Sequence, residues 1–203
     1  SEIARRTRFT IHLSTSKGRL EAVWIGPQPG DAPTLVFLHE GLGCVALWKD
    51  FPARLVELTG CGAVVYSRLG YGRSDPCPLP RPVDFMHHEG LTVLPDVIRQ
   101  CGIHDHLLVG HSDGGSIALI HAGGSAGVGL KGVITLAAHV FSEDRTRQSI
   151  EAARRQYRDG DLKGRLSVYH GKNTDRAFRG WNDVWLHPDF REWNIEAFLP
   201  TIG

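Results

Sequence analysis

The sequence predicts an α/β fold in which a mostly parallel sheet carries helices on both of its faces. Short apolar runs bounded by turn residues alternate along the chain with longer segments whose apolar residues recur every three or four positions. The short runs are typical of strands buried on both faces, and the longer segments are typical of amphipathic helices. Strands that alternate with helices pair in parallel, because each helix returns the chain to the same end of the sheet.

The sheet is expected to begin with a hairpin. Phe9, Ile11 and Leu13 alternate with polar residues, and residues 20–25 supply the returning strand. Further strands are expected at residues 34–38, 63–66, 106–109 and 132–137. The last of these has no later strand beside it, so we expect an open sheet edge that recruits a second copy of the chain.

Helices are expected between these strands and after the last one. Apolar residues recur at helical spacing over 47–58 and 85–101, and the second helix ends before Gly102, a typical C-cap residue. Beyond about residue 140 the pattern changes to charged helices and then to an aromatic-rich segment. The chain therefore divides into a sheet core, residues 1–139, and a helical cap or lid region, residues 140–203.

The composition restricts the function classes. The chain has 203 residues, 41% of them hydrophobic, and a formal net charge of +1, which fits one globular domain without a charged surface for nucleic acid. No apolar run approaches the about 20 residues that span a bilayer. The four cysteines lie far apart without a C-x-x-C pair, which predicts reduced thiols in a cytoplasmic protein and no metal site. We therefore expect a small-molecule partner, and neither nucleic acid nor a membrane.

Residues Gly110-His111-Ser112-Asp113-Gly114 form a Gly-x-Ser-x-Gly motif between the strand at 106–109 and a helical run at 116–121. A serine on such a sharp strand-to-helix turn exposes its hydroxyl above the sheet. Glycines flank it because neighbouring segments come too close for larger side chains. Ser112 is therefore a candidate nucleophile, and the alternative is a serine whose hydroxyl only caps the helix.

Two further motifs follow expected strands in the same way. His39-Glu40-Gly41-Leu42-Gly43 follows the third strand, and Gly70-Tyr71-Gly72-Arg73-Ser74 follows the fourth. Together with the motif around Ser112, they make the chain resemble the α/β-hydrolase fold family of the serine-nucleophile type. The resemblance covers nearly the whole chain, and it implies that the helices after residue 140 form a cap over the active site.

The resemblance also implies an activity and site residues. It implies an esterase-like hydrolase that forms an acyl intermediate on Ser112 and uses no cofactor, on a small ester or other carbonyl substrate. Carbon–carbon bond hydrolysis stays open. The oxyanion hole would be formed by the backbone N–H groups of Asp113 and of Gly41 or Leu42. The Asp113 carboxylate is interpreted as a first-turn acid favoured by the helix dipole, without a catalytic role.

The sequence departs from the family pattern in two places. Glu40 stands where the oxyanion loop usually has glycine, and we expect its carboxylate to point away from the site or to pair with a cation. The family order also places a catalytic acid and then a histidine after the nucleophile. The chain ends at Gly203, where the next strand would begin, so we expect a C-terminally truncated form that is inactive or impaired. The alternative is a non-catalytic ligand-binding or interaction protein on the same fold.

Three histidines could serve as the base. His39 ends a strand near the site, where a structural hydrogen-bonding role is favoured, and His111 is next to Ser112 in sequence and is expected to point elsewhere. His139 closes the sixth strand, and Glu143 or Asp144 just beyond it could supply an acid. This last set is a possible alternative triad within the chain.

The substrate pocket is expected among residues that follow the strands and residues of the cap. Trp181 and Trp185 are spaced four apart, so they either line an apolar pocket or hold the cap helices together. The whole expected pocket comprises His39, Glu40, His111, His139, Trp181 and Trp185. The run His87-His88-Glu89 lacks metal-ligand spacing and is interpreted as a solvated helix face.

Overall fold

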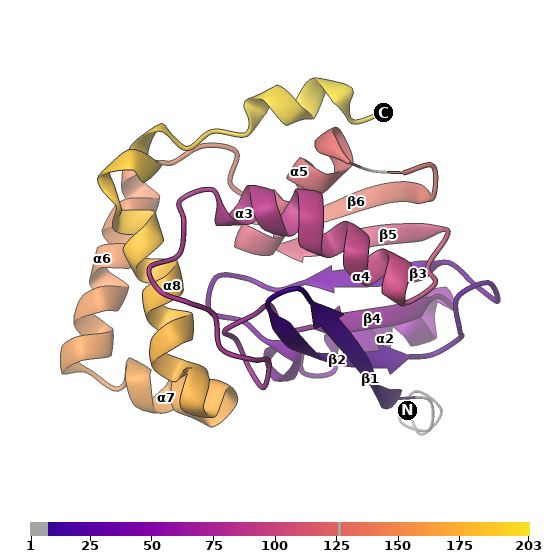
Figure 1. Cartoon of the computed structure of the whole chain (residues 1–203), viewed down its shortest axis with the longest axis horizontal. Helices are drawn as coiled ribbons and strands as arrows, with labels where there is room; N and C mark the ends of the chain where they lie inside the picture. The colour runs from indigo at the N-terminus through magenta and orange to yellow at the C-terminus, as the bar shows by residue number, and fades with distance from the viewer. Residues whose placement is uncertain (1–7, 126) are drawn as a thin grey trace.

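The computed structural model describes residues 8–125 and 127–203 and contains a six-stranded mixed sheet in the order β1-β2-β4-β3-β5-β6 (Figure 1). β1 and β2 form an antiparallel hairpin, β2 is antiparallel to β4, and β4, β3, β5 and β6 are parallel to one another. The bounds are β1 Arg8–Thr15, β2 Gly18–Ile25, β3 Thr34–Leu38, β4 Gly62–Tyr66, β5 His106–His111 and β6 Leu130–Leu136. The predicted fold class and all six predicted strands are confirmed.

Helices cover both faces of the sheet. α2 (Phe51–Thr59) packs on one face, and α5 (Asp113–Gly124) packs on the other beside the continuous helix formed by α3 (Phe85–His88), the π-helical segment η2 (Glu89–Val93) and α4 (Leu94–Gln100). Successive residues of the central strands alternate between two apolar cores, because their side chains point to opposite faces. The helix predicted over residues 85–101 is confirmed, with a π-helical turn that the sequence did not indicate.

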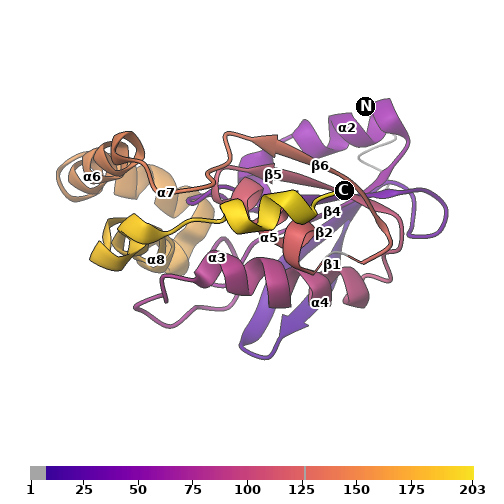
Figure 2. The same cartoon turned by 90° about the horizontal axis from the view of Figure 1, so that it is seen from above.

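Three helices that follow β6, and that we call the cap helices after the expectation from the sequence, gather beside the sheet (Figure 1). They are α6 (Asp144–Asp159), α7 (Leu162–His170) and α8 (Thr174–Leu186), and Figure 2 shows them as a group separate from the helices that cover the sheet. The chain then returns to the core, where η5 (Glu196–Thr201) lies along α5. The Thr201 hydroxyl donates a hydrogen bond of 2.7 Å to the Gly123 carbonyl oxygen there.

The parallel strands position the site. The turns after β3, β4 and β5 lie at the same end of the sheet, because parallel strands share their carboxyl ends. The first residues after β3, β4 and β5 are His39, Ser67 and Ser112, respectively. Within the described residues, none of the helices is both long and apolar enough to cross a membrane.

Candidate active site

Ser112 occupies a strained turn between β5 and α5. Its backbone has φ 51° and ψ −118°, a combination that side-chain-bearing residues rarely adopt. The hydroxyl makes no capping hydrogen bond with the helix, which contradicts the alternative that Ser112 is only a cap. A Cβ atom at Gly114 would overlap the carbonyl oxygen of Leu38, and one at Gly110 would overlap that of Gly114. The flanking glycines are therefore required by close backbone contacts, as the motif predicts.

His139 is the base candidate that the structure brings to Ser112. Its Nε2 atom lies 3.4 Å from the Ser112 Oγ atom. The Ser116 hydroxyl of α5 fixes the histidine backbone, because it donates to the His139 carbonyl oxygen at 2.6 Å and accepts from the His139 N–H at 3.0 Å. The Trp185 ring stands edge-on to the imidazole, with the two ring centroids 4.9 Å apart.

No carboxylate makes a hydrogen bond with this imidazole among the described residues. Glu143 and Asp144, the acids that the sequence offered as partners, make no hydrogen bond with His139 and lie at the exposed start of α6. The alternative triad is therefore present as a Ser112–His139 pair, without its third member.

The loop that follows β3, residues 39–43, is the expected oxyanion loop, and hydrogen bonds fix its carbonyl groups. Arg68, which is buried, donates to the carbonyl oxygens of His39 at 2.6 Å and of Glu40 at 3.0 Å. The His170 Nε2–H group of the cap donates to the Leu42 carbonyl oxygen at 2.8 Å. Within the described chain, the N–H groups of Gly41 and Leu42 have no hydrogen-bond acceptor. The first turn of α5 also carries free N–H groups.

His39 has a structural role. Its Nδ1–H donates to the Glu40 carbonyl oxygen at 2.7 Å, and its Nε2 accepts from the Arg68 backbone N–H at 3.0 Å. Burial, together with the positive charge of Arg68, holds the pKa of His39 well below its ordinary value. Both ring nitrogens are occupied and the ring is neutral, so His39 has no free nitrogen to accept a proton from Ser112.

Asp113 has more contacts than its interpretation as a first-turn acid predicts. Its side chain is 1% exposed, and Oδ1 accepts a 3.1 Å hydrogen bond from the Trp185 indole N–H of the cap. Burial raises the pKa of Asp113, while the positive charge of Arg68 and the nearby His139 imidazole act in the opposite direction. The carboxylate thus connects α5 to the cap helix α8.

A cavity of about 200 Å³ lies over Ser112, between the core and the cap. Among the expected pocket residues, His139, Trp181 and Trp185 line it. α6 adds residues that no motif marked, namely Thr146, Ser149 and Ile150. Trp185 lines the cavity and also packs against Phe190 and Trp193, which follow α8.

The other expected pocket residues lie outside this cavity. His39 is buried beneath the oxyanion loop, and the Glu40 carboxylate lies 3.6 Å from the His111 Nδ1 atom. Glu40 therefore faces the imidazole of His111, the residue next to Ser112. Trp181 packs over Gly41, where a Cβ atom would overlap the indole.

Metal ligands do not converge anywhere in the described residues, since no group of three His, Cys, Asp or Glu side chains is placed to hold an ion. The groups at the site are a hydroxyl, an imidazole and free backbone N–H donors. Such a set can attack a carbonyl carbon, accept the hydroxyl proton and stabilise the resulting oxyanion.

Comparisons with known proteins agree with this geometry. A model of the alpha/beta hydrolase family matches residues 35–199. A search of curated proteins found no sequence that matches the chain. Many solved structures match its fold.

Three of these structures illustrate the likeness. An esterase from Exiguobacterium antarcticum is 20% identical with a TM-score of 0.71, over 96% of this chain and 78% of the esterase. The proline iminopeptidase of Mycobacterium smegmatis is 16% identical with a TM-score of 0.66, over 96% and 78% of the two chains. A carboxylesterase of Nitrososphaera gargenis is 17% identical with a TM-score of 0.61, over 95% and 73%.

The family match covers most of the chain and includes the three turns that build the site. At these identities the solved structures show the fold alone. The chain belongs to the alpha/beta hydrolase family.

Proposed function

We propose that the protein is a serine hydrolase that acts on a small ester or related carbonyl substrate through an acyl–Ser112 intermediate. Family membership supports hydrolase activity in general. The observation that carries the finer proposal is the positive φ of Ser112, whose Oγ atom lies beside a cavity and 3.4 Å from the His139 Nε2 atom. Hydrogen bonds of this length are common before substrate binds and shorten in the reactive complex.

The proposed reaction has two halves. The Ser112 Oγ atom attacks the carbonyl carbon while His139 takes the hydroxyl proton, and the backbone N–H groups of Asp113 and of Gly41 or Leu42 stabilise the oxyanion. The intermediate collapses when His139 gives this proton to the leaving group. Water then attacks the acyl carbon, loses its proton to His139, and the acid product leaves as Ser112 regains its proton.

The size and lining of the cavity over Ser112 support a proposal for the substrate class. A volume of about 200 Å³ suits a small acyl group, and Ile150, Trp181 and Trp185 make much of its wall apolar. Carbonyl compounds with compact apolar acyl groups are therefore the proposed substrates, small esters foremost among them.

The activity of this form is expected to be low. A histidine base works best when a carboxylate fixes its orientation and stabilises its protonated form. No carboxylate makes a hydrogen bond with His139 among the described residues, and its position is fixed by the Ser116 hydrogen bonds and by the edge-on contact with the Trp185 ring.

A fluorophosphonate probe tests the proposal, because it reacts covalently with activated serines. We expect slow labelling of the protein, complete loss in Ser112→Ala, and a rate lowered by about 10²-fold or more in His139→Phe. Ser167→Ala removes an exposed hydroxyl remote from the site and should label like the parent. Intact-mass spectrometry over time measures the rates.

Other results would count against the proposal. Labelling that persists in Ser112→Ala would place the nucleophile elsewhere, and an unchanged rate in His139→Phe would remove the base. Complete absence of labelling in the parent would favour the ligand-binding alternative on the same fold.

We also propose a cytoplasmic location. The four cysteines are all free in the structure, which fits a reducing compartment, where disulfides rarely persist.

A further inference from the structure

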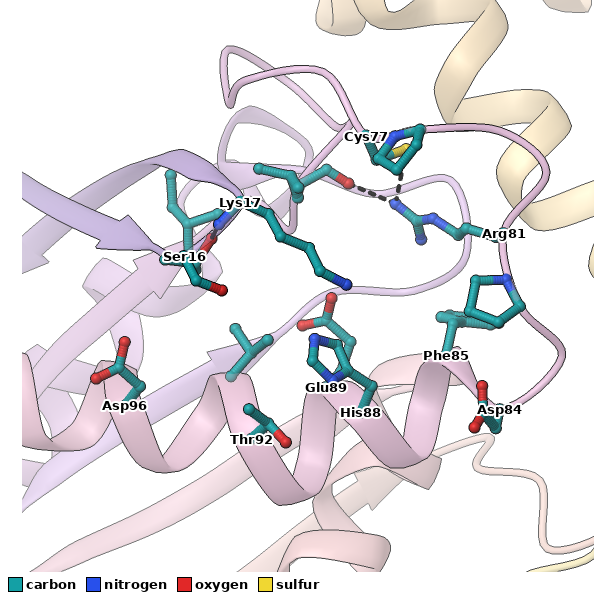
Figure 3. A pocket seen from close by; sticks show the side chains of 16 residues that line it. Ser16, Lys17, Cys77, Arg81, Asp84, Phe85, His88, Glu89, Thr92 and Asp96 are labelled. Atoms are coloured by element: carbon teal, nitrogen blue, oxygen red, sulfur yellow. Dashed lines mark hydrogen bonds between the residues drawn. The ribbon is translucent and has the colours of Figure 1, made fainter.

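A second cavity, of about 350 Å³, lies between the β1–β2 hairpin, the loop that follows β4 and the helix that begins at α3 (Figure 3). Its walls come from the turn of the β1–β2 hairpin, from residues 77–84, and from the helix formed by α3, η2 and α4. None of its lining residues lines the cavity over Ser112. It is therefore a separate cavity, larger than the candidate active-site cavity.

Glu89 is the unusual residue of this cavity. The sequence predicted a solvated helix face for it, and this is wrong, because its side chain is only 8% exposed. Its Oε2 atom is buried and makes no hydrogen bond within the described chain. The pKa of Tyr66 is raised, mainly because the side chain is buried and secondly because of the negative charge of Glu89. A buried carboxylate oxygen without a hydrogen-bond donor destabilises the folded protein. Glu89 is therefore a candidate for binding a ligand that supplies the donor.

The backbone at Glu89 is also unusual. Glu89 begins the π-helical segment η2, and such segments are frequent at functional sites because they displace side chains from regular helical positions. The Gly90 carbonyl oxygen accepts hydrogen bonds from His121 at 2.9 Å and from Ser125 at 3.3 Å, both on or beside α5. The segment is therefore fixed to the helix that carries the nucleophile.

Two cationic side chains face the same space. Arg81 is fixed: it donates to the Leu69 carbonyl oxygen and to the Cys77 sulfur at 3.4 Å, and its guanidinium group lies over the Phe85 ring at 5.4 Å. Lys17 extends from the hairpin turn into the cavity toward Glu89 (Figure 3). No ion pair within 4.0 Å joins Lys17 to a carboxylate in the part of the chain that the structure describes.

The remaining wall is largely apolar. Leu20, Leu69, Pro78, Phe85 and Val93 contribute to it. A ligand for this cavity must therefore supply a donor to Glu89, an acceptor to Lys17 and an apolar group that contacts the remaining wall.

We propose that this cavity binds a small zwitterion with an apolar side chain, such as a free amino acid. Its ammonium group donates to the Glu89 carboxylate, its carboxylate pairs with the Lys17 ammonium group, and its side chain contacts the apolar wall. Arg81 adds positive charge to the same cavity, and this charge also interacts with Glu89. The proposal does not depend on the activity of Ser112.

Isothermal titration calorimetry with three probes of one shape tests the proposal. L-leucine carries both charges, isoamylamine only the ammonium group, and 4-methylpentanoate only the carboxylate. We expect saturable binding of leucine, and binding at least about tenfold weaker for each of the other two. Glu89→Gln and Lys17→Met should each weaken leucine binding at least about tenfold.

Matched controls separate this site from the active site and from general charge effects. Lys172→Met removes an exposed lysine elsewhere, and Ser112→Ala removes the proposed nucleophile. Both should bind leucine like the parent.

Absence of saturable leucine binding would overturn the proposal, as would leucine binding that Glu89→Gln and Lys17→Met leave unchanged. Equal binding of leucine and isoamylamine would also overturn it. Circular dichroism checks that Glu89→Gln is folded. If it is not, the binding of leucine by Lys17→Met alone tests the proposal, because Lys17 is an exposed turn residue whose substitution should leave the fold intact.

Discussion

Ser112 retains its unfavourable backbone conformation because hydrogen bonds to β6 and α5 fix its N–H and carbonyl groups. A positive φ at a residue with a side chain costs about 1–3 kcal/mol. The Ser112 N–H donates to the Leu136 carbonyl oxygen at 2.8 Å, and its carbonyl oxygen accepts from the Ser116 N–H at 3.0 Å. β6 and α5 therefore hold the turn from two directions. The strain keeps the hydroxyl out of the helix and directed toward His139.

Two glycine substitutions test this account at the residue scale. Gly114→Ala should destabilise the protein severely, by about 3 kcal/mol or more, because its Cβ would overlap the Leu38 carbonyl oxygen. Gly164→Ala lies in exposed α7 with no heavy atom within 4 Å of the added Cβ, and it should stabilise by about 0.5–1 kcal/mol. Urea unfolding followed by circular dichroism measures both. Equal effects would show that close packing does not explain the glycine at 114.

At the scale of elements, α7 is the part of the cap that fixes the active-site loops. Its last residue, His170, accepts from the Gly72 N–H at 2.9 Å and donates to the Leu42 carbonyl oxygen. The Asn173 amide just after it donates to the Gly72 and Ser74 carbonyl oxygens at 3.2 and 2.7 Å. One helix end therefore connects the oxyanion loop to the turn after β4.

This connection predicts a pH dependence. Burial lowers the pKa of His170 below its ordinary value of 6.5. The hydrogen bond to Leu42 and the charges of Glu40 and Glu21 oppose this shift but do not cancel it. His170 therefore binds a proton more readily in the unfolded chain than in the folded protein. Its contribution to the free energy of unfolding is present above pH 6.5 and is lost as the pH falls below that value. Protonation would also turn the Nδ1 acceptor into a donor that faces the Gly72 N–H.

The measurement is the free energy of unfolding in urea from about pH 5 to about pH 8. The parent should lose stability on acidification, and His170→Gln should be less stable at neutral pH with a shallower acid loss. His39, whose pKa is also lowered by burial, contributes an acid loss in both proteins. Parallel pH curves for the parent and His170→Gln would contradict the assignment.

At the scale of the whole molecule, β6 forms an edge of the described sheet and pairs only with β5. Ile134 and Leu136 on it are 46% and 41% exposed. Unpaired N–H and carbonyl groups next to exposed apolar side chains favour strand addition by another chain. We therefore keep self-association through β6 as a proposal.

Sedimentation velocity tests it. The parent should form dimers or larger species as its concentration rises, and Ile134→Lys should shift the population toward monomer, because a lysine at an edge opposes pairing. Leu58→Lys is the matched control, since Leu58 is 81% exposed on α2, away from the edge, and should leave association unchanged. A parent that stays monomeric at high concentration would exclude the proposal.

The sequence by itself determined the strand and helix order, the position of Ser112 and the flanking glycines. These features depend on local patterns, because apolar periodicity and turn residues act over a few neighbouring positions. The conformation that directs the serine hydroxyl is part of the same local motif. Most of what the motif predicted is therefore present in the structure.

Only the tertiary structure decided which side chains meet. His139 was one of several candidate bases until β6 and α5 placed it beside Ser112, which is 27 residues away in sequence. The Trp185–Asp113 and His170–Leu42 hydrogen bonds join residues 72 and 128 positions apart. Glu89 looked solvated because its neighbours His87 and His88 are polar, and the hairpin turn and the loop after β4 enclose it only in the folded chain. Such contacts depend on how the helices pack across the sheet, and no local pattern in the sequence encodes that packing.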